Sequence, residues 1–182
     1  MNTPMVIFIS VGLLAVTIVM SCCTDFFRRH ALPIFIIFTL LMALLVSIAI
    51  TGFSSKVVLM AVVITLGLTI GLTIYACIYL IYLGKTDSDV TGCGPYLMVI
   101  GLVLLFFGII AIFWRNPIVQ LIYSGFSSLL FGFYIVFDTQ LVLGNKQHGY
   151  SLDDAYFAAI QLYMDIINLL LNLLQIIARF QN

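Results

Sequence analysis

The 182-residue sequence predicts an all-α fold, a polytopic transmembrane helix bundle, and three observations support this class. First, 64% of the residues are hydrophobic and 8% are charged, whereas soluble domains carry about 25% charged residues. Second, six apolar stretches are each long enough to cross the hydrocarbon core, which takes about 20 helical residues. Third, the connections between them are short, so residues 1–182 are predicted to form one transmembrane bundle domain.

The spans are bounded by charged or Gly- and Pro-containing stretches: TDFFRRHA, GFSSK, GKTDSDVTGCG, RNP and GNKQHGYSLDD. In order, the predicted spans are approximately residues 4–23, 32–52, 57–83, 95–114, 118–143 and 153–180. The first lacks the basic start of a signal peptide, so we interpret it as a retained helix. The fifth begins at Pro117, where a missing N–H costs nothing, and the sixth follows Ser151 and Asp154, which resemble a capping box.

Charge and cysteine content exclude several function classes. Seven basic and seven acidic residues give a net charge of zero, so no nucleic-acid partner is expected. The spacing of the four cysteines fits neither a disulfide framework nor a zinc site. Basic residues are slightly more frequent in the odd-numbered connections, which favours a cytosolic location for them.

The last predicted helix combines a lipid-compatible composition with a polar face. Its polar residues are spaced 4, 3, 4 and 3 apart, which places them on one side of a helix: Gln161, Asp165, Asn168, Asn172 and Gln175. Lipid cannot satisfy these groups, so this side is expected to face the bundle interior or water. For the amides we favour hydrogen bonding between helices, and for Asp165 a functional role, because an intramembrane acid is expensive.

Asp138 is the second acid within a predicted span, near the end of the fifth helix. Measured from the connection that follows, Asp138 and Asp165 differ in depth by about 9 Å at 1.5 Å per residue. They come level if DDAYF, residues 153–157, lies in the membrane interface. Two carboxyl groups that meet are expected to share a proton, and such a pair can sense pH, bind a cation or perform acid–base chemistry.

A catalytic role for the pair is the weakest alternative, and no enzymatic activity is expected. Intramembrane aspartyl proteases carry Tyr-Asp and Gly-x-Gly-Asp signatures, and neither precedes Asp138 or Asp165. No HExxH, P-loop or Ser/His pair is present, and His30 and His148 both lie in predicted connections.

A second polar stripe, Thr65, Thr69 and Thr73, lies on the third predicted helix beside the GxxxG pair Gly67 and Gly71. We favour close helix packing with threonines bonded to their own backbone, and the alternative is a hydroxyl-lined cavity wall.

The stretch FDTQLVLGNKQHGYSLDDAYFAAIQLYMDIINLL resembles the C-terminal signature of the transmembrane BAX-inhibitor-motif family, most closely its lifeguard, or glutamate-receptor-associated, branch. CCTDFFRRHALP and TDSDVTGCGPYL are also similar to that branch, so the resemblance covers essentially the whole chain and is strongest over residues 134–175. Ser151-Leu152-Asp153-Asp154 stands where SPEE or SPED is usual in that branch, and the Pro-x-Asn that often follows the basic cluster is absent.

The resemblance implies a seven-helix fold with the last helix in the centre, and this chain begins at the counterpart of the second helix. It implies calcium leak from intracellular stores, in the endoplasmic reticulum or Golgi, and suppression of cell death. By motif, the pH-sensitive acids of the family fall on Asp138 and Asp165, with calcium as the permeant or bound ion and no other cofactor. A latching base for the first acid falls on Arg28 or Arg29, which are otherwise topology anchors.

We therefore expect a pH-sensitive calcium leak through a site at Asp138 and Asp165, with the amides and threonines named above lining the polar core. The alternative is a non-conducting regulator of cell death that acts through protein partners in the bilayer.

Overall fold

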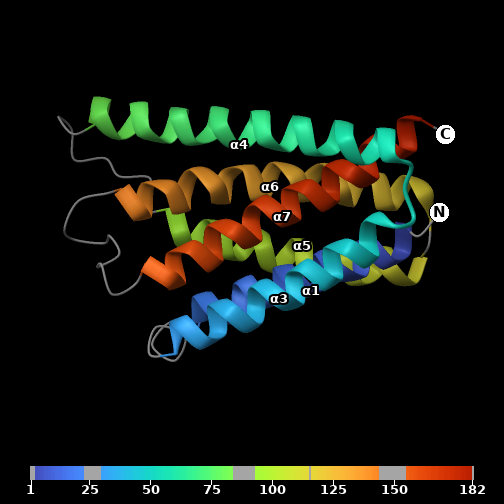
Figure 1. Cartoon of the computed structure of the whole chain (residues 1–182), viewed down its shortest axis with the longest axis horizontal. Helices are drawn as coiled ribbons and strands as arrows, with labels where there is room; N and C mark the ends of the chain where they lie inside the picture. Colours follow the sequence, from blue (N-terminus) through green and yellow to red (C-terminus); the bar gives the residue numbers. More distant parts are fainter. Residues whose placement is uncertain (1–2, 23–29, 84–92, 115, 144–154, 182) are drawn as a thin grey trace.

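The computed structural model describes residues 3–22, 30–83, 93–114, 116–143 and 155–181, and the regular structure in these ranges is helical (Figure 1). Its helices are α1 (Thr3–Cys22), α3 (Ala31–Ile50), α4 (Ser55–Leu83), α5 (Gly94–Trp114), α6 (Pro117–Leu143) and α7 (Ala155–Phe180). Each begins and ends within about two residues of a predicted span, which confirms the all-helical fold. Among the described residues, α3 to α7 are long and apolar enough to cross a membrane, and α1 contributes a shorter apolar stretch, Met5–Val19.

Helix α7 lies in the centre of the bundle, as predicted. It packs against α1, α3, α4 and α6, and Figure 1 shows it crossing between the other helices. Its polar side chains explain this position, because a helix that carries a carboxyl group and four amides is far more stable inside the protein than against acyl chains.

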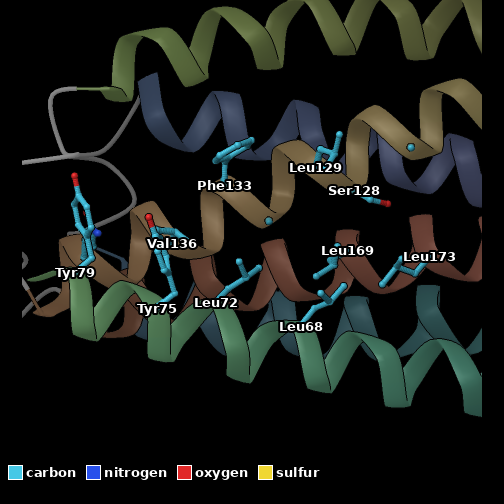
Figure 2. Close-up of a pocket in the computed structure, with 13 residues that line it drawn as sticks. Leu68, Leu72, Tyr75, Tyr79, Ser128, Leu129, Phe133, Val136, Leu169 and Leu173 are labelled. Carbon is cyan, nitrogen blue, oxygen red and sulfur yellow. The ribbon is translucent and has the colours of Figure 1, made fainter.

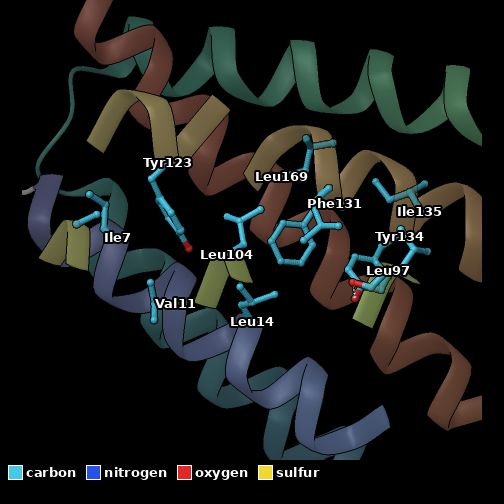
Figure 3. Packing of buried hydrophobic residues seen from close by; sticks show 12 residues of the cluster. Ile7, Val11, Leu14, Leu97, Leu104, Tyr123, Phe131, Tyr134, Ile135 and Leu169 are labelled. Atoms are coloured by element: carbon cyan, nitrogen blue, oxygen red, sulfur yellow. Dashed lines mark hydrogen bonds between the residues drawn. The ribbon is translucent and has the colours of Figure 1, made fainter. Parts of the chain in front are cut away.

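The main apolar cluster joins α1, α5 and α6, with Leu169 of α7 at its edge (Figure 3). At Gly108 of α5 these helices approach each other closely. A Cβ added there would overlap Val11 Cγ2 of α1 and lie 2.8 Å from Tyr123 Cε2 of α6. Only a residue without a side chain fits this contact, as is common where membrane helices meet.

Helices α3 and α4 form the periphery and expose large apolar side chains. Leu40 and Leu44 of α3 are more than half exposed, as are Leu59 and Ile70 of α4. In a membrane-spanning chain such surfaces face acyl chains, which solvate leucine as well as a protein core does.

The expectation of close helix packing through Gly67 and Gly71 is wrong. Both glycines are exposed on α4, and a Cβ added at either would have no atom within 4 Å. Neighbouring helices pack on the other side of α4, where Ala61, Thr65 and Ala76 are buried.

Candidate functional site

The two acids within the helices meet in the bundle interior. Asp138 of α6 is 4% exposed and Asp165 of α7 is fully buried. Their carboxyl groups interact electrostatically and lie within reach of a hydrogen bond to each other. Neither carboxyl group therefore faces the acyl chains.

The direction of the side chains helps to close the depth difference expected from the sequence. Helical side chains lean toward the N-terminus of their own helix. Because α6 and α7 are antiparallel neighbours, Asp138 leans deeper into the bundle while Asp165 leans toward the connection between them. The stretch 153–157 is described only from Ala155, so its interfacial location stays a prediction.

A shared proton is the chemistry this contact favours. Neither carboxyl oxygen of Asp165 accepts a hydrogen bond from a described donor. A hydrogen bond between two carboxyl groups requires a proton on one of them, because two carboxylates offer only acceptors. Among the described residues, Tyr134 is a titratable neighbour of both acids, and its hydroxyl donates to the Leu97 carbonyl oxygen of α5 at 3.1 Å.

The amides of α7 join it to α1 and α6, as the interpretation of hydrogen bonding between helices predicts. Ser10 Oγ of α1 donates to Asn168 Oδ1 at 3.3 Å and accepts from Asn172 Nδ2 at 3.2 Å. Ser124 Oγ of α6 donates to Gln175 Oε1 at 2.9 Å. Gln161, one turn before Asp165, is buried on the same side of α7.

Several buried polar atoms beside these contacts have no hydrogen-bond partner within the described ranges. They are Asn172 Oδ1, Gln175 Nε2, Ser127 Oγ and the Tyr123 hydroxyl, which lies beside Ser10 and Ser127. Such atoms retain the capacity to bind water, and the oxygens among them could also face a cation. They extend the polar character from Asp165 along the junction of α1, α6 and α7.

We call the polar side chains along the junction of α1, α6 and α7 the polar column. It ends at Arg179, near the C-terminal end of α7. Arg179 Nη2 donates to Gln120 Oε1 of α6 at 2.7 Å. Fourteen residues separate Asp165 from Arg179, which is about 21 Å along a helix and most of the thickness of the hydrocarbon core.

A polar stripe on α6 completes this column and was not recognised from the sequence. Its members follow nearly the same spacing as those on α7: Gln120, Ser124, Ser127, Tyr134 and Asp138. Applying the helical period to the fifth span, and treating serine and tyrosine as polar, would have found it.

The other predicted site residues are not brought to the acid pair. Thr65 is buried and bonds its own backbone, donating to the Ala61 carbonyl oxygen at 2.7 Å, whereas Thr69 and Thr73 are half-buried on α4. The Thr69 hydroxyl has no partner among the described residues. Arg28 and Arg29, the candidate latch, lie outside the described residues, as do His148 and the capping-box residues Ser151 and Asp154.

The two acids by themselves supply few ligands for a metal ion. Within the part of the chain that the structure describes, no group of three His, Cys, Asp or Glu side chains could hold a metal ion. Calcium takes 6–8 oxygen ligands, which is more than the four oxygens of two carboxyl groups.

Comparison with known proteins gives consistent matches along the chain. The family model described as "Inhibitor of apoptosis-promoting Bax1" matches residues 1–182. Protein lifeguard 3 is 29% identical in Mus musculus, over 97% of this chain and 57% of the relative, and 30% identical in Homo sapiens, over 94% and 55%. Bax inhibitor 1 of Schizosaccharomyces pombe is 34% identical over 80% of this chain and 51% of the relative. The chain thus spans little more than half the length of these relatives.

Proposed function

The chain is a multi-pass membrane protein of the family of inhibitors of apoptosis-promoting Bax1, and from this we propose that it mediates a pH-sensitive calcium leak from an intracellular store. The observation that carries the proposal is the contact between Asp138 and Asp165 in the bundle interior. Acids inside membrane helices usually belong to ion or proton pathways, because few other roles offset the free energy of burying them.

The polar column along α7 supports a path for the ion. The acid pair lies toward one end, and the contact between Arg179 and Gln120 lies at the other. Between them, amide and hydroxyl groups of α1, α6 and α7 offer oxygen ligands of the kind that calcium prefers. The apolar side chains packed around the column would keep the path narrow until the helices move.

Protonation of Asp138 determines whether the proposed leak increases or decreases as the pH falls. An ionised Asp138 attracts a cationic latch, for which Arg28 and Arg29 are the candidates from the sequence. Adding a proton to Asp138 removes that attraction and frees the helices to separate. We therefore expect the leak to increase as the pH falls on the side that carries the α6–α7 connection.

The test is calcium efflux from loaded vesicles that contain the purified protein, measured across a pH series. Asp165→Asn and Asp138→Asn each remove one ionisable group while keeping the size of the side chain. We expect Asp138→Asn to abolish the pH response and Asp165→Asn to shift it, because Asp138 stays ionisable in the second variant. Both should change the basal flux, whereas Thr39→Val, a loss of polarity on α3, should leave the flux and its pH response intact. Equal and pH-insensitive flux in the wild type and both Asn variants would refute the ion site.

A second candidate is a non-conducting regulator of cell death in an endoplasmic reticulum or Golgi membrane, without an enzymatic step. Two observations favour it: the amides of α7 hold helices together, and the broad apolar faces of α3 and α4 could contact regulators of cell death in the membrane. Recovery of the same cell-death partner with the wild type and Asp165→Asn, together with no flux from either, would select this function. A tagged chain located by microscopy would test the organelle.

A further inference from the structure

Arg179 continues the polar side of α7 to the end of the helix. The polar residues from Gln161 to Gln175 are spaced 4, 3, 4 and 3 apart, and Arg179 follows after another four, which places it on the same side. Gln120 occupies the corresponding place on α6, as the first member of the polar stripe that ends at Asp138. The two stripes therefore meet at both ends, through the acids at one and through Arg179 and Gln120 at the other.

The guanidinium group of Arg179 is turned toward the bundle interior. A base at the end of a membrane helix often serves only to anchor the helix, and then it extends to the headgroups. Arg179 Nη2 instead donates to Gln120 Oε1 at 2.7 Å, and the Gln120 side chain is 3% exposed. Arg179 itself is half-buried. Its charge is therefore held at the end of the polar column, where salt and water screen it less than at an exposed position.

Hydrogen bonds connect this end of the polar column to its middle. Ser124 Oγ of α6 lies 2.9 Å from both the Gln120 carbonyl oxygen and Gln175 Oε1. Gln175 is one turn before Arg179 on α7, and Asn172 lies on the same side, three residues further into the bundle. An ion that moves along this side of α7 therefore has to pass the guanidinium group before it leaves the bundle at this end.

A cavity beside Gln140 is a poor alternative route for a cation. It has a volume of about 700 Å³ and lies between α4, α6 and α7, as Figure 2 shows. Leu68, Leu129 and Leu173 line its end nearer to Arg179, so a cation would lose its water there without gaining oxygen ligands. The polar column remains the better route, and it leads past Arg179.

A fixed positive charge at the end of a cation path raises the barrier for the ion in proportion to the charge of that ion. Arginine side chains exclude cations from selective pores in this way. At the same place, the barrier for a divalent ion rises by twice as much as the barrier for a monovalent ion. Because the rate depends exponentially on the barrier, removing the charge should increase divalent flux by the square of the factor for monovalent flux.

From these observations we propose that Arg179, through its positive charge, restricts the passage of calcium at the end of the polar column remote from the acid pair. Gln120 is its positioning residue, because it holds the guanidinium group at that end. The inference rests on the proposed leak and deepens it. Arg179 determines the rate of the leak and its dependence on ion charge, whereas Asp138 determines its response to pH.

The experiment compares tracer exchange of calcium and of rubidium in phosphatidylcholine vesicles that contain the full chain. The same ions are present on both sides, so no membrane potential develops. Arg179→Gln and Arg179→Met both remove the charge. We expect each to raise rubidium exchange about threefold and calcium exchange about tenfold, the square of that factor. Arg179→Lys keeps the charge, so its exchange of both ions should stay close to that of the wild type.

Lys56→Gln is the matched control, because it removes the same charge from an exposed residue at the same end of the bundle. Lys56 lies in the first turn of α4. The contact from Gln181 Nε2 to Met60 Sδ, at 3.2 Å, places this part of α4 beside the C-terminal end of α7. Salt screens an exposed charge, so Lys56→Gln should exchange both ions at the rate of the wild type.

Three results would each overturn the role of Arg179. They are exchange that does not rise in Arg179→Gln and Arg179→Met, an increase by the same factor for both ions, and an equal increase in Lys56→Gln. An equal factor for both ions would mean that the substitution opens the fold rather than removes a charge. In each case a pH response that is lost in Asp138→Asn would leave the proposed leak standing. No exchange in the wild type or any variant would refute both.

Discussion

Helices α7 and α3 are both apolar and of similar length, yet they occupy opposite places in the bundle. The apolar window of α7 is 67% buried, whereas that of α3 is 11% buried, although α3 is the more hydrophobic of the two. In water the order would be reversed, because the more apolar helix would be driven inside. In lipid the polar helix lies inside, since acyl chains can solvate leucine but not a carboxyl group or an amide.

The largest expected effect comes from introducing into α3 a carboxyl group like that of Asp165 in α7. Leu44 is 62% exposed near the middle of α3, so Leu44→Asp would hold a carboxyl group against acyl chains. We expect insertion of this helix to become less favourable by about 3 kcal/mol. Glycosylation mapping of the inserted fraction would measure it, with Leu44→Phe as the control. Normal insertion of Leu44→Asp would contradict the location of α3 at the lipid surface.

Replacing one leucine with alanine on α7 and one on α3 shows how tightly each helix is packed. Leu171 of α7 is fully buried, so Leu171→Ala leaves a cavity and should reduce the free energy of unfolding by about 2 kcal/mol. Leu44→Ala should change it by less than about 0.5 kcal/mol, because lipid fills the space. Unfolding in mixed micelles with increasing SDS measures both. Equal losses would show that α3 is covered by protein rather than lipid.

The difference between packed and open positions also distinguishes Gly108 of α5 from Gly67 of α4. Gly108→Ala places a methyl group against Val11 and the Tyr123 ring, and should destabilise the fold by about 1–3 kcal/mol. Gly67→Ala adds the same methyl group where no atom lies within 4 Å, and should be neutral or slightly stabilising. The thermal midpoints of the two variants in detergent provide the measurement. A stable Gly108→Ala protein would mean that α1 and α5 are not in close contact.

The smallest effect concerns the hydrogen bonds that hold α1 to α7. Ser10→Ala removes the contacts with Asn168 and Asn172, and should cost about 1 kcal/mol, the usual scale for such bonds between membrane helices. Ser47→Ala on the exposed part of α3 is the control. A double-mutant cycle with Asn172→Leu should show that the losses are not additive. Additive losses would indicate that the two side chains act independently.

The sequence by itself determined the class of fold and the approximate limits of its helices, and it predicted that the polar side of the last one faces the bundle interior or water. The reason is physical and local. A span needs about 20 apolar residues, and polar residues at the helical period must face away from lipid wherever the helix lies. The same reasoning singled out Asp138 and Asp165 before their contact was visible. The GxxxG motif misled it, because small residues permit a close approach but do not cause one.

Only the tertiary structure decided which groups meet. Ser10 is 158 residues from Asn168, and no local pattern relates one apolar helix to another when their surfaces are chemically alike. The contact between the acids, the close approach at Gly108 and the cavity beside Gln140 all depend on how the helices are rotated and tilted. In a membrane these choices follow from packing shape and a few hydrogen bonds, because burial of apolar surface no longer selects among them.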